Sequence, residues 1–143
     1  MKILVYGYGW IGKQFIKYFN KNNITFMAGQ SRVDNTNDLI KEIDSIKPTH
    51  VLSLIGRTNG KIDDKEYTTI DYLEQKGKIY ENVRDNLYAP LTVAILCKER
   101  NIHFTYLGTG CIFESIYDDQ ITTTSDVFNE ESEPNFFGSA YSV

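Results

Sequence analysis

The chain has 143 residues, the length of one domain, and its 15 basic and 19 acidic residues give a formal net charge of -4. This balance excludes a broad cationic surface, so neither nucleic acid nor an anionic membrane is expected as a partner. No signal peptide follows Met1 and no apolar run reaches the ~18 residues of a membrane helix, which predicts a cytoplasmic protein. Cys97 and Cys111 lack the spacing of a disulfide framework or a metal site, so both are expected to be free thiols and no metal is expected.

Short apolar runs alternate with amphipathic stretches along residues 2–107. They predict strands at residues 2–6, 24–28, 50–55 and 102–107, with helices beginning near Ile11, running from Leu39 to before Pro48, and spanning residues 79–100. Strands that alternate with helices at this spacing predict βαβ units with right-handed crossovers. The expected fold class is therefore α/β, a Rossmann-like doubly wound parallel sheet with helices on both faces and the strand order 3-2-1-4.

Three segments are assigned from their composition and apolar pattern. The helix over residues 79–100 should kink at Pro90, and one of its faces carries Val83, Leu87, Leu91, Ala94 and Ile95. Residues 57–78 are polar, which predicts a long irregular excursion with a turn or two of helix. Residues 114–133 contain many acidic residues and no basic one, so we expect a solvated loop there.

The sequence GYGWIG, residues 7–12, lies between the first predicted strand and the first predicted helix. In this context the pattern G-x-G-x-x-G predicts a dinucleotide-binding turn, because its glycines allow a tight turn and a close approach of the backbone to a pyrophosphate. Gly7, Gly9 and Gly12 would form the turn, and the helix beginning at Trp10 and Ile11 would present its N-H groups to the phosphates. The alternative is a glycine turn without a ligand.

The end of the second predicted strand decides which dinucleotide is bound. An NAD site usually has a carboxylate there for the ribose hydroxyls, whereas this chain has Ser31 and Arg32, whose hydroxyl and guanidinium suit a 2′-phosphate. NADP(H) is therefore the expected cofactor, and Gly56, after the third strand, is assigned to the same site. The alternative is that Arg32 is an ordinary surface residue and Asp34 serves the ribose of NAD.

The stretch LGTGCIFE, residues 107–114, follows the fourth predicted strand. Ligands of doubly wound sheets bind outside the carboxyl ends of the strands, so Thr109 and Cys111 are expected at a reactive position, next to the first strand and its glycine turn. A hydroxyl there can donate to a substrate oxygen and a thiol can carry a proton. The commoner alternative for Cys111 is a small buried hydrophobe, which is also the expected state of Cys97.

The last motif is EPNFFGSAYS, residues 133–142. A tyrosine acts as an acid near neutral pH when a neighbouring cation lowers its pKa from about 10, and a lysine one helical turn later is the usual device. For Tyr141 that lysine would stand at position 145. Without it, Tyr141 is one of ten tyrosines and the alternative of a surface aromatic residue is favoured.

Together the glycine turn, KPTHVLSLIG, NVRDNLYAPLTVA, LGTGCIFE and EPNFFGSAYS resemble the extended short-chain dehydrogenase/reductase family. The likeness covers essentially the whole chain and is greatest to the sugar-nucleotide 3,5-epimerase/4-reductases that form nucleotide-L-rhamnose, relatives of dTDP-4-dehydrorhamnose reductase. It implies a UDP- or dTDP-4-keto-6-deoxyhexose as substrate and NADPH as the reductant at C4. Family members usually carry G-x-x-G-x-x-G, so the shorter first gap here departs from the pattern.

The resemblance also implies roles for three residues. Thr109 would hydrogen-bond the C4 oxygen, Tyr141 would protonate it, and Cys111 would transfer a proton during epimerisation at C3 and C5. Residues 1–143 would be one NADP-binding Rossmann domain, the N-terminal part of a longer chain whose substrate domain and lysine lie beyond residue 143. Such a part would by itself bind the cofactor weakly and not turn over efficiently.

Two rival functions stay open. One is a reductase-like regulatory subunit that keeps the nucleotide pocket without turnover, and the other is a reductase without epimerase activity. The sequence does not distinguish UDP from dTDP. It also leaves the oligomeric state open, with a homodimer among the options.

Overall fold

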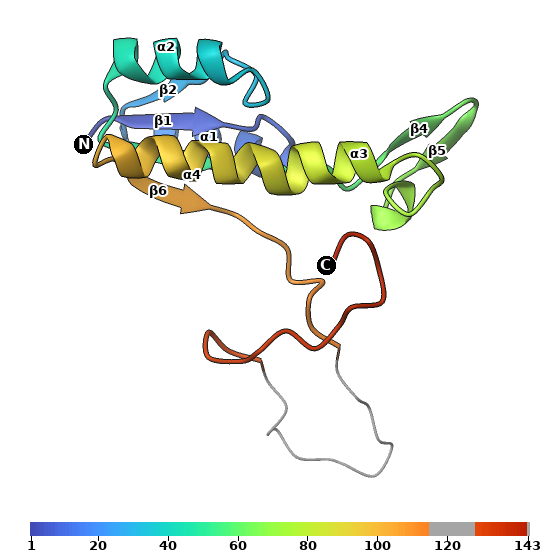
Figure 1. Ribbon diagram of the computed structural model, residues 1–143. Helices are drawn as coiled ribbons and strands as arrows, with labels where there is room; N and C mark the ends of the chain where they lie inside the picture. Colours follow the sequence, from blue (N-terminus) through green and yellow to red (C-terminus); the bar gives the residue numbers. More distant parts are fainter. Residues whose placement is uncertain (115–127, 143) are drawn as a thin grey trace. The chain divides into compact units, whose positions relative to one another are not determined.

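The computed structural model describes residues 1–114 and 128–142, and it divides the chain into two compact units, Met1–Gly108 and Thr109–Val143 (Figure 1). Among the described residues, the helices and strands all lie in the first unit, and we describe each unit by itself. Residues 115–127, most of the predicted acidic loop, lie outside the described residues.

The first unit is built on a parallel sheet, which confirms the predicted α/β class. Its strands are β1 (Ile3–Tyr6), β2 (Phe26–Ala28), β3 (His50–Ser53) and β6 (His103–Tyr106). The central strand β1 is buried at all four positions, as expected of an apolar run covered on both faces.

The sheet order is β2-β1-β3-β6, so the predicted order 3-2-1-4 is wrong. The third strand lies on the side of β1 away from β2, with Leu4 opposite Val51, and the fourth strand pairs with β3 instead of β1. After β2 the chain crosses over β1 to form β3. It then continues in the same direction across the sheet to form β6 at the edge. Because right-handed crossovers in opposite directions place their helices on opposite faces, this order also determines which face each helix covers.

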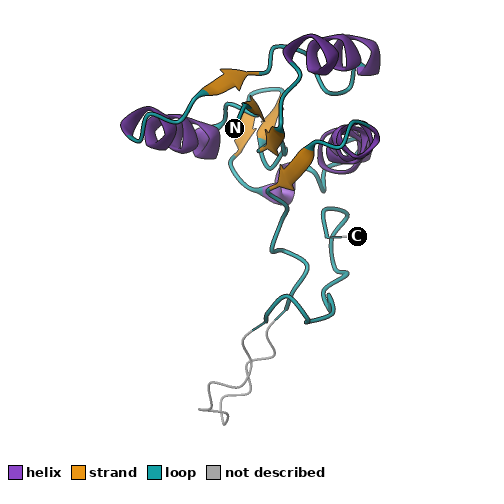
Figure 2. Ribbon diagram, turned by 90° about the vertical axis from the view of Figure 1, so that its left-hand side faces the viewer, coloured by secondary structure: helices purple, strands orange, loops and turns teal. Residues whose placement is uncertain are grey.

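Helices cover both faces of the sheet (Figure 2). On one face α1 (Trp10–Lys21) packs Phe19 against Ile3 and Val5. On the other face lie α2 (Thr36–Ile46) and α4 (Ala89–Glu99), and the core there includes Leu4, Tyr6, Leu39, Ile43, Val51, Val93 and Cys97. The predicted end of α2 before Pro48 is confirmed, since Lys47 caps the helix in a left-handed conformation, with φ at 51°.

The excursion after β3 is more regular than predicted. It contains an antiparallel hairpin of β4 (Gly60–Ile62) and β5 (Lys65–Tyr67), followed by a short 3-10 helix at Ile70–Tyr72. Each strand has only three residues, too few to show an apolar pattern, so the sequence did not reveal them. The tight turn at Asp63, with φ at 51°, and the buried ring of Tyr72 against Gly60 hold the hairpin instead.

The long helix is continuous but changes its winding. It begins as α3 (Ile79–Asn82), widens into a π-helical segment over Val83–Tyr88 and continues as α4. The π-helical segment takes the place of the predicted kink, because Pro90 has no N-H for the ordinary α-helical bond and the wider turn accommodates that loss.

The predicted apolar face of this helix is not the face that packs on the sheet. Val83, Leu87, Leu91 and Ile95 are between 46% and 58% exposed. The core contacts come instead from Ala89, Val93, Leu96 and Cys97. The prediction that Cys97 is a core residue is confirmed, and burial raises the pKa of its thiol to about 11.

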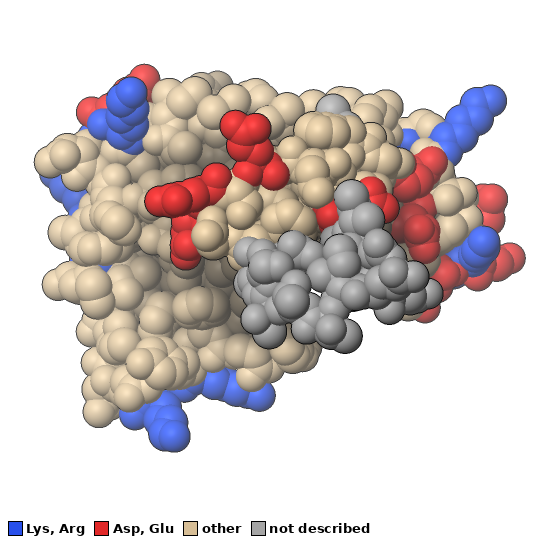
Figure 3. Space-filling view, turned by 90° about the horizontal axis from the view of Figure 1, so that it is seen from below, with Lys and Arg blue, Asp and Glu red and all other residues tan. Residues whose placement is uncertain are grey.

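Across the part of the chain that the structure describes, every helix is too short or too polar to cross a membrane. On the face shown in Figure 3, the visible Lys and Arg side chains occur in separate groups and not in one continuous patch. The chain has a formal net charge of -4, and the described residues of this face form no broad basic surface.

Candidate functional site

The glycine turn lies where β1 ends and α1 begins. Gly7 has φ at 93°, and a Cβ there would lie 2.5 Å from the carbonyl carbon of Leu54. A Cβ at Gly12 would lie 2.1 Å from the carbonyl oxygen of Gly7. These two glycines therefore allow the turn to pack directly against the end of β3 and against the first turn of α1.

Gly9 differs from its two neighbouring glycines, because a Cβ there would have nothing within 4 Å. It is also the N-cap of α1 and makes no side-chain hydrogen bond to the helix N-terminus. Trp10 and Ile11 begin the helix with side chains 77% and 40% exposed. The open backbone above the positive end of a 12-residue helix fits a diphosphate, as the motif predicts.

A cavity of about 850 Å³ lies at the carboxyl end of β2. Its wall comprises Gln30, Ser31, Arg32, Asp34, Asn35, Asp38, Lys41 and Glu42. The wall thus contains Ser31 and Arg32, which are predicted to select NADP(H), and Asp34, the alternative partner for the ribose of NAD.

Glu42, from α2, holds the backbone at this strand end. Its carboxylate accepts hydrogen bonds from the N-H groups of Gln30 and Ser31, at 2.6 and 3.1 Å, and from the hydroxyl of Tyr6 at 2.8 Å. Burial alone would raise the pKa of Glu42. The hydrogen bonds that its carboxylate accepts lower the pKa by more than burial raises it, so the pKa of Glu42 is below its ordinary value. Burial, and then the bond to Glu42, raises the pKa of Tyr6. The sequence did not indicate Glu42, which is 11 residues from Ser31.

Replacing Glu42 with Gln should reduce the free energy of unfolding by about 2 kcal/mol at pH 7, because an amide cannot accept from all three donors. The lowered pKa of Glu42 means that its stabilisation is present above the unfolded value of about 4.3 and is lost as the pH falls through the folded value. Urea unfolding measured at a series of pH values should therefore show that the free energies of unfolding of Glu42→Gln and of the unchanged chain converge in acid. Exposed Glu66→Gln is the matched control, and a deficit that does not change with pH contradicts this role.

Arg32 and Asp34 are in contact with each other. The Arg32 Nε lies 2.9 Å from Asp34 Oδ1, and its Nη2 lies 2.8 Å from Oδ2. The hydrogen bonds from Arg32 lower the pKa of Asp34. The two predicted alternatives for the adenosine ribose are therefore one ion pair on the wall of the cavity.

The carboxyl end of β3 is held by the π-helical segment. Asn86 accepts from the Arg57 N-H at 2.7 Å and donates to the Arg57 carbonyl oxygen at 3.0 Å, and its Oδ1 is 3.5 Å from where a Cβ of Gly56 would lie. Arg57 also donates to Asp85 at 2.6 Å. The sequence suggested Gly56 but not Asn86; a π-helical segment, which often marks a functional site, becomes visible only in the folded chain.

Thr109 and Cys111 lie in the second unit, in one turn. The N-H of Cys111 donates to Thr109 Oγ1 at 3.0 Å. Cys111 is exposed, so the alternative of a buried hydrophobe is wrong for this residue. The expectation that this strand end lies next to the first strand is also wrong, because β6 pairs with β3, which separates it from β1.

The second unit joins its two motifs through Asn135. The side chain of Asn135 accepts from the N-H of Glu114 at 2.8 Å and donates to the Glu114 carbonyl at 2.9 Å. The N-H groups of Asn135 and Phe136 both donate to the carbonyl of Ile112 at 3.1 Å. The side-chain amide of Asn135 thus pairs with the backbone of Glu114 as a neighbouring strand would, and it fixes the segment after Cys111. The sequence did not indicate this role.

Tyr141 lies in a turn with the hydrogen bonds of a helix N-cap. The N-H of Ser142 donates to Ser139 Oγ at 3.2 Å, and the N-H of Ser139 lies 3.3 Å from Ser142 Oγ. This reciprocal pattern resembles a capping box, with Tyr141 in the first turn.

No protein-family profile matches the chain. Protein L780 of Acanthamoeba polyphaga mimivirus is 49% identical to it over 144 residues, which are 100% of this chain and 48% of L780. The Arabidopsis thaliana enzyme RHM1, a trifunctional UDP-glucose 4,6-dehydratase/UDP-4-keto-6-deoxy-D-glucose 3,5-epimerase/UDP-4-keto-L-rhamnose-reductase, is 37% identical over 99% of this chain and 20% of its own length. The chain belongs to the extended short-chain dehydrogenase/reductase family.

Solved structures of this family agree with that assignment. The crystal structure of the L780 UDP-rhamnose synthase matches with a TM-score of 0.85 over 99% of this chain and 48% of that one. A dTDP-4-dehydrorhamnose reductase from Clostridium acetobutylicum has a TM-score of 0.76 at 19% identity and shares the fold. The chain spans about half the length of L780. Structures that share the fold at 14–16% identity were solved with NADP or NAD bound.

Proposed function

We propose that this chain is the NADP(H)-binding part of an epimerase/reductase that converts a UDP- or dTDP-4-keto-6-deoxyglucose to the nucleotide-L-rhamnose. The observation that carries the proposal is the 49% identity with L780, a protein described as a UDP-rhamnose synthase, because it extends over this whole chain. The glycine turn supports the cofactor, since its open Gly9 backbone and helix N-terminus fit a diphosphate.

The residues of the first unit would hold the cofactor. The backbone from Gly9 to Gly12 would bind the diphosphate, and Ser31 and Arg32 would face the adenosine ribose and its 2′-phosphate. Gly56, fixed beside Asn86, would line the same site. When bound, NADPH supplies the hydride for C4 of the sugar.

The residues of the second unit would handle protons. A ketone at C4 acidifies the hydrogens at C3 and C5, so both centres can invert when one group removes a proton and another returns it from the opposite side. Cys111 would return that proton, Thr109 would hold the C4 oxygen, and Tyr141 would protonate it on reduction. The exposure of Cys111 and its bond to Thr109 are compatible with these roles.

A chimera tests the proposal directly. The segment of L780 that matches this chain is replaced by the chain, and the product is supplied with NADPH and UDP- or dTDP-4-keto-6-deoxyglucose. We expect nucleotide-rhamnose to form with one NADPH consumed per sugar. A folded chimera that binds NADPH but makes no product favours the regulatory subunit, and one that reduces only an epimerised ketosugar favours the plain reductase.

A further inference from the structure

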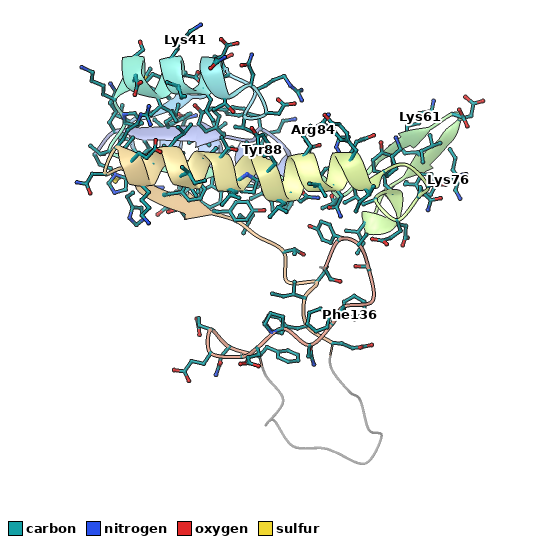
Figure 4. The ribbon with its side chains drawn as sticks, in the orientation of Figure 1. Lys41, Lys61, Lys76, Arg84, Tyr88 and Phe136 are labelled. Atoms are coloured by element: carbon teal, nitrogen blue, oxygen red, sulfur yellow. The ribbon has the colours of Figure 1, made fainter. Side chains whose placement is uncertain are left out.

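Asp34 contacts two arginines that come from different elements. Arg32, in the loop after β2, forms the bidentate pair described above, and the Nε of Arg84 lies 3.8 Å from Asp34 Oδ2. Arg84 projects from the π-helical segment (Figure 4). The Asp34 carboxylate therefore lies between two guanidinium groups at the wall of the cavity.

Arg84 is held in place independently of Asp34. Arg84 donates to Asp85 at 2.6 and 2.9 Å, and this arginine is only 22% exposed. The hydroxyls of Thr36 and Tyr88 lie 3.2 Å apart, which fastens the start of α2 to the π-helical segment. Removal of the Asp34 charge should thus leave Arg84 in position and release the side chain of Arg32, which is 72% exposed and is paired with Asp34.

The remaining carboxylates of the cavity do not reproduce this arrangement. Glu42 is engaged by two backbone N-H groups and by Tyr6. Asp38 accepts from Asn35 at 2.6 Å and lies 3.7 Å from Lys41. Among the acidic residues of the cavity wall, Asp34 is the one that forms ion pairs with arginines.

We propose that Asp34 is the specificity-determining residue of the cofactor site: it competes with the 2′-phosphate of NADP(H) for Arg32 and Arg84. The inference rests on the proposed function, in which this cavity takes the adenosine end of the cofactor. A phosphate monoester carries more negative charge than a carboxylate and offers three acceptor oxygens, so it can displace Asp34 and engage both guanidiniums. Arg84 becomes a second phosphate-binding cation, and the built-in competitor keeps the preference for NADPH over NADH small.

Calorimetric titration of the L780 chimera that carries this chain, with 2′,5′-ADP and with ADP, tests this directly, because the probes differ in the 2′-phosphate. Asp34→Asn should tighten binding of 2′,5′-ADP about tenfold, the scale of one charge-assisted hydrogen bond, and leave ADP unchanged. Adding Arg84→Gln should remove most of that gain. NADPH and NADH should follow the same pattern.

Asp44→Asn is the matched control. Asp44 is also paired with an arginine, Arg100, at 2.6 Å, and it lies on α2 outside the cavity wall, so it changes the net charge equally. The inference is overturned if Asp34→Asn leaves 2′,5′-ADP binding unchanged or weaker, or tightens both probes equally. Binding of neither probe to any variant overturns the proposed cofactor site itself, and the inference with it.

Discussion

Replacing Gly7 with alanine is expected to lower the free energy of unfolding by about 2–5 kcal/mol and to abolish NADPH binding. Gly7 has φ at 93°, a region that costs a residue with a side chain about 1–2 kcal/mol. The added methyl group would also meet backbone atoms of Leu54 and Ile55 at 2.5–2.8 Å, and overpacking of this kind typically costs 1–3 kcal/mol. Urea unfolding followed by circular dichroism measures the loss.

Two other glycines separate the causes of this loss. Gly77 also has a positive φ, at 82°, but a Cβ there meets nothing within 4 Å, so Gly77→Ala should show the conformational cost alone. Gly9→Ala should leave stability nearly unchanged and weaken NADPH binding, because its open backbone is where the diphosphate would approach. Equal destabilisation by Gly7→Ala and Gly77→Ala would show that the contact with Leu54 has no effect.

Replacing Cys111 with serine in the L780 chimera is expected to lower the rate of epimerisation by about 10²- to 10⁴-fold, the usual contribution of a positioned proton-transfer group. Reduction of an already epimerised ketosugar should stay within about threefold, since that step is assigned to Thr109 and Tyr141. The epimerisation rate is measured as incorporation of solvent deuterium at C3 and C5, and the reduction rate as NADPH consumption.

Cys97→Ser is the control for this substitution. Cys97 is fully buried, so a serine there should reduce stability and leave the ratio of the two rates unchanged. If deuterium incorporation persists in Cys111→Ser, or if both rates fall together, Cys111 has no specific role in epimerisation. Because the Cys111 thiol is exposed, replacing it with serine should leave the fold intact. A change in the epimerisation rate alone would therefore not be caused by a loss of structure.

Two carboxylates at the carboxyl end of β2 have different partners. Glu42 fixes the strand end through its backbone N-H groups, whereas Asp34 occupies the arginines that a 2′-phosphate would need. One carboxylate thus stabilises the fold, and the other sets the competition for the ligand. Replacing Glu42 should therefore change the unfolding curves, whereas replacing Asp34 should change the binding curves.

The sequence by itself determined the features that depend on neighbouring residues. Alternating apolar runs defined the strands and helices, and GYGWIG defined the turn, because strand burial, helix periodicity and glycine conformation are local properties. The core position of Cys97 was also predicted, although the apolar face assigned to the same helix was wrong.

Only the tertiary structure decided which distant segments meet. The position of β3 beside β1, the contact of Glu42 with Ser31 and the approach of Arg84 to Asp34 join residues far apart in the chain. The hairpin at Gly60–Tyr67 and the exposed face of the long helix also depend on packing and not on local pattern. Strand order and charge pairing are selected by the burial and electrostatic free energy of the whole unit, for which no short stretch of sequence carries a signal.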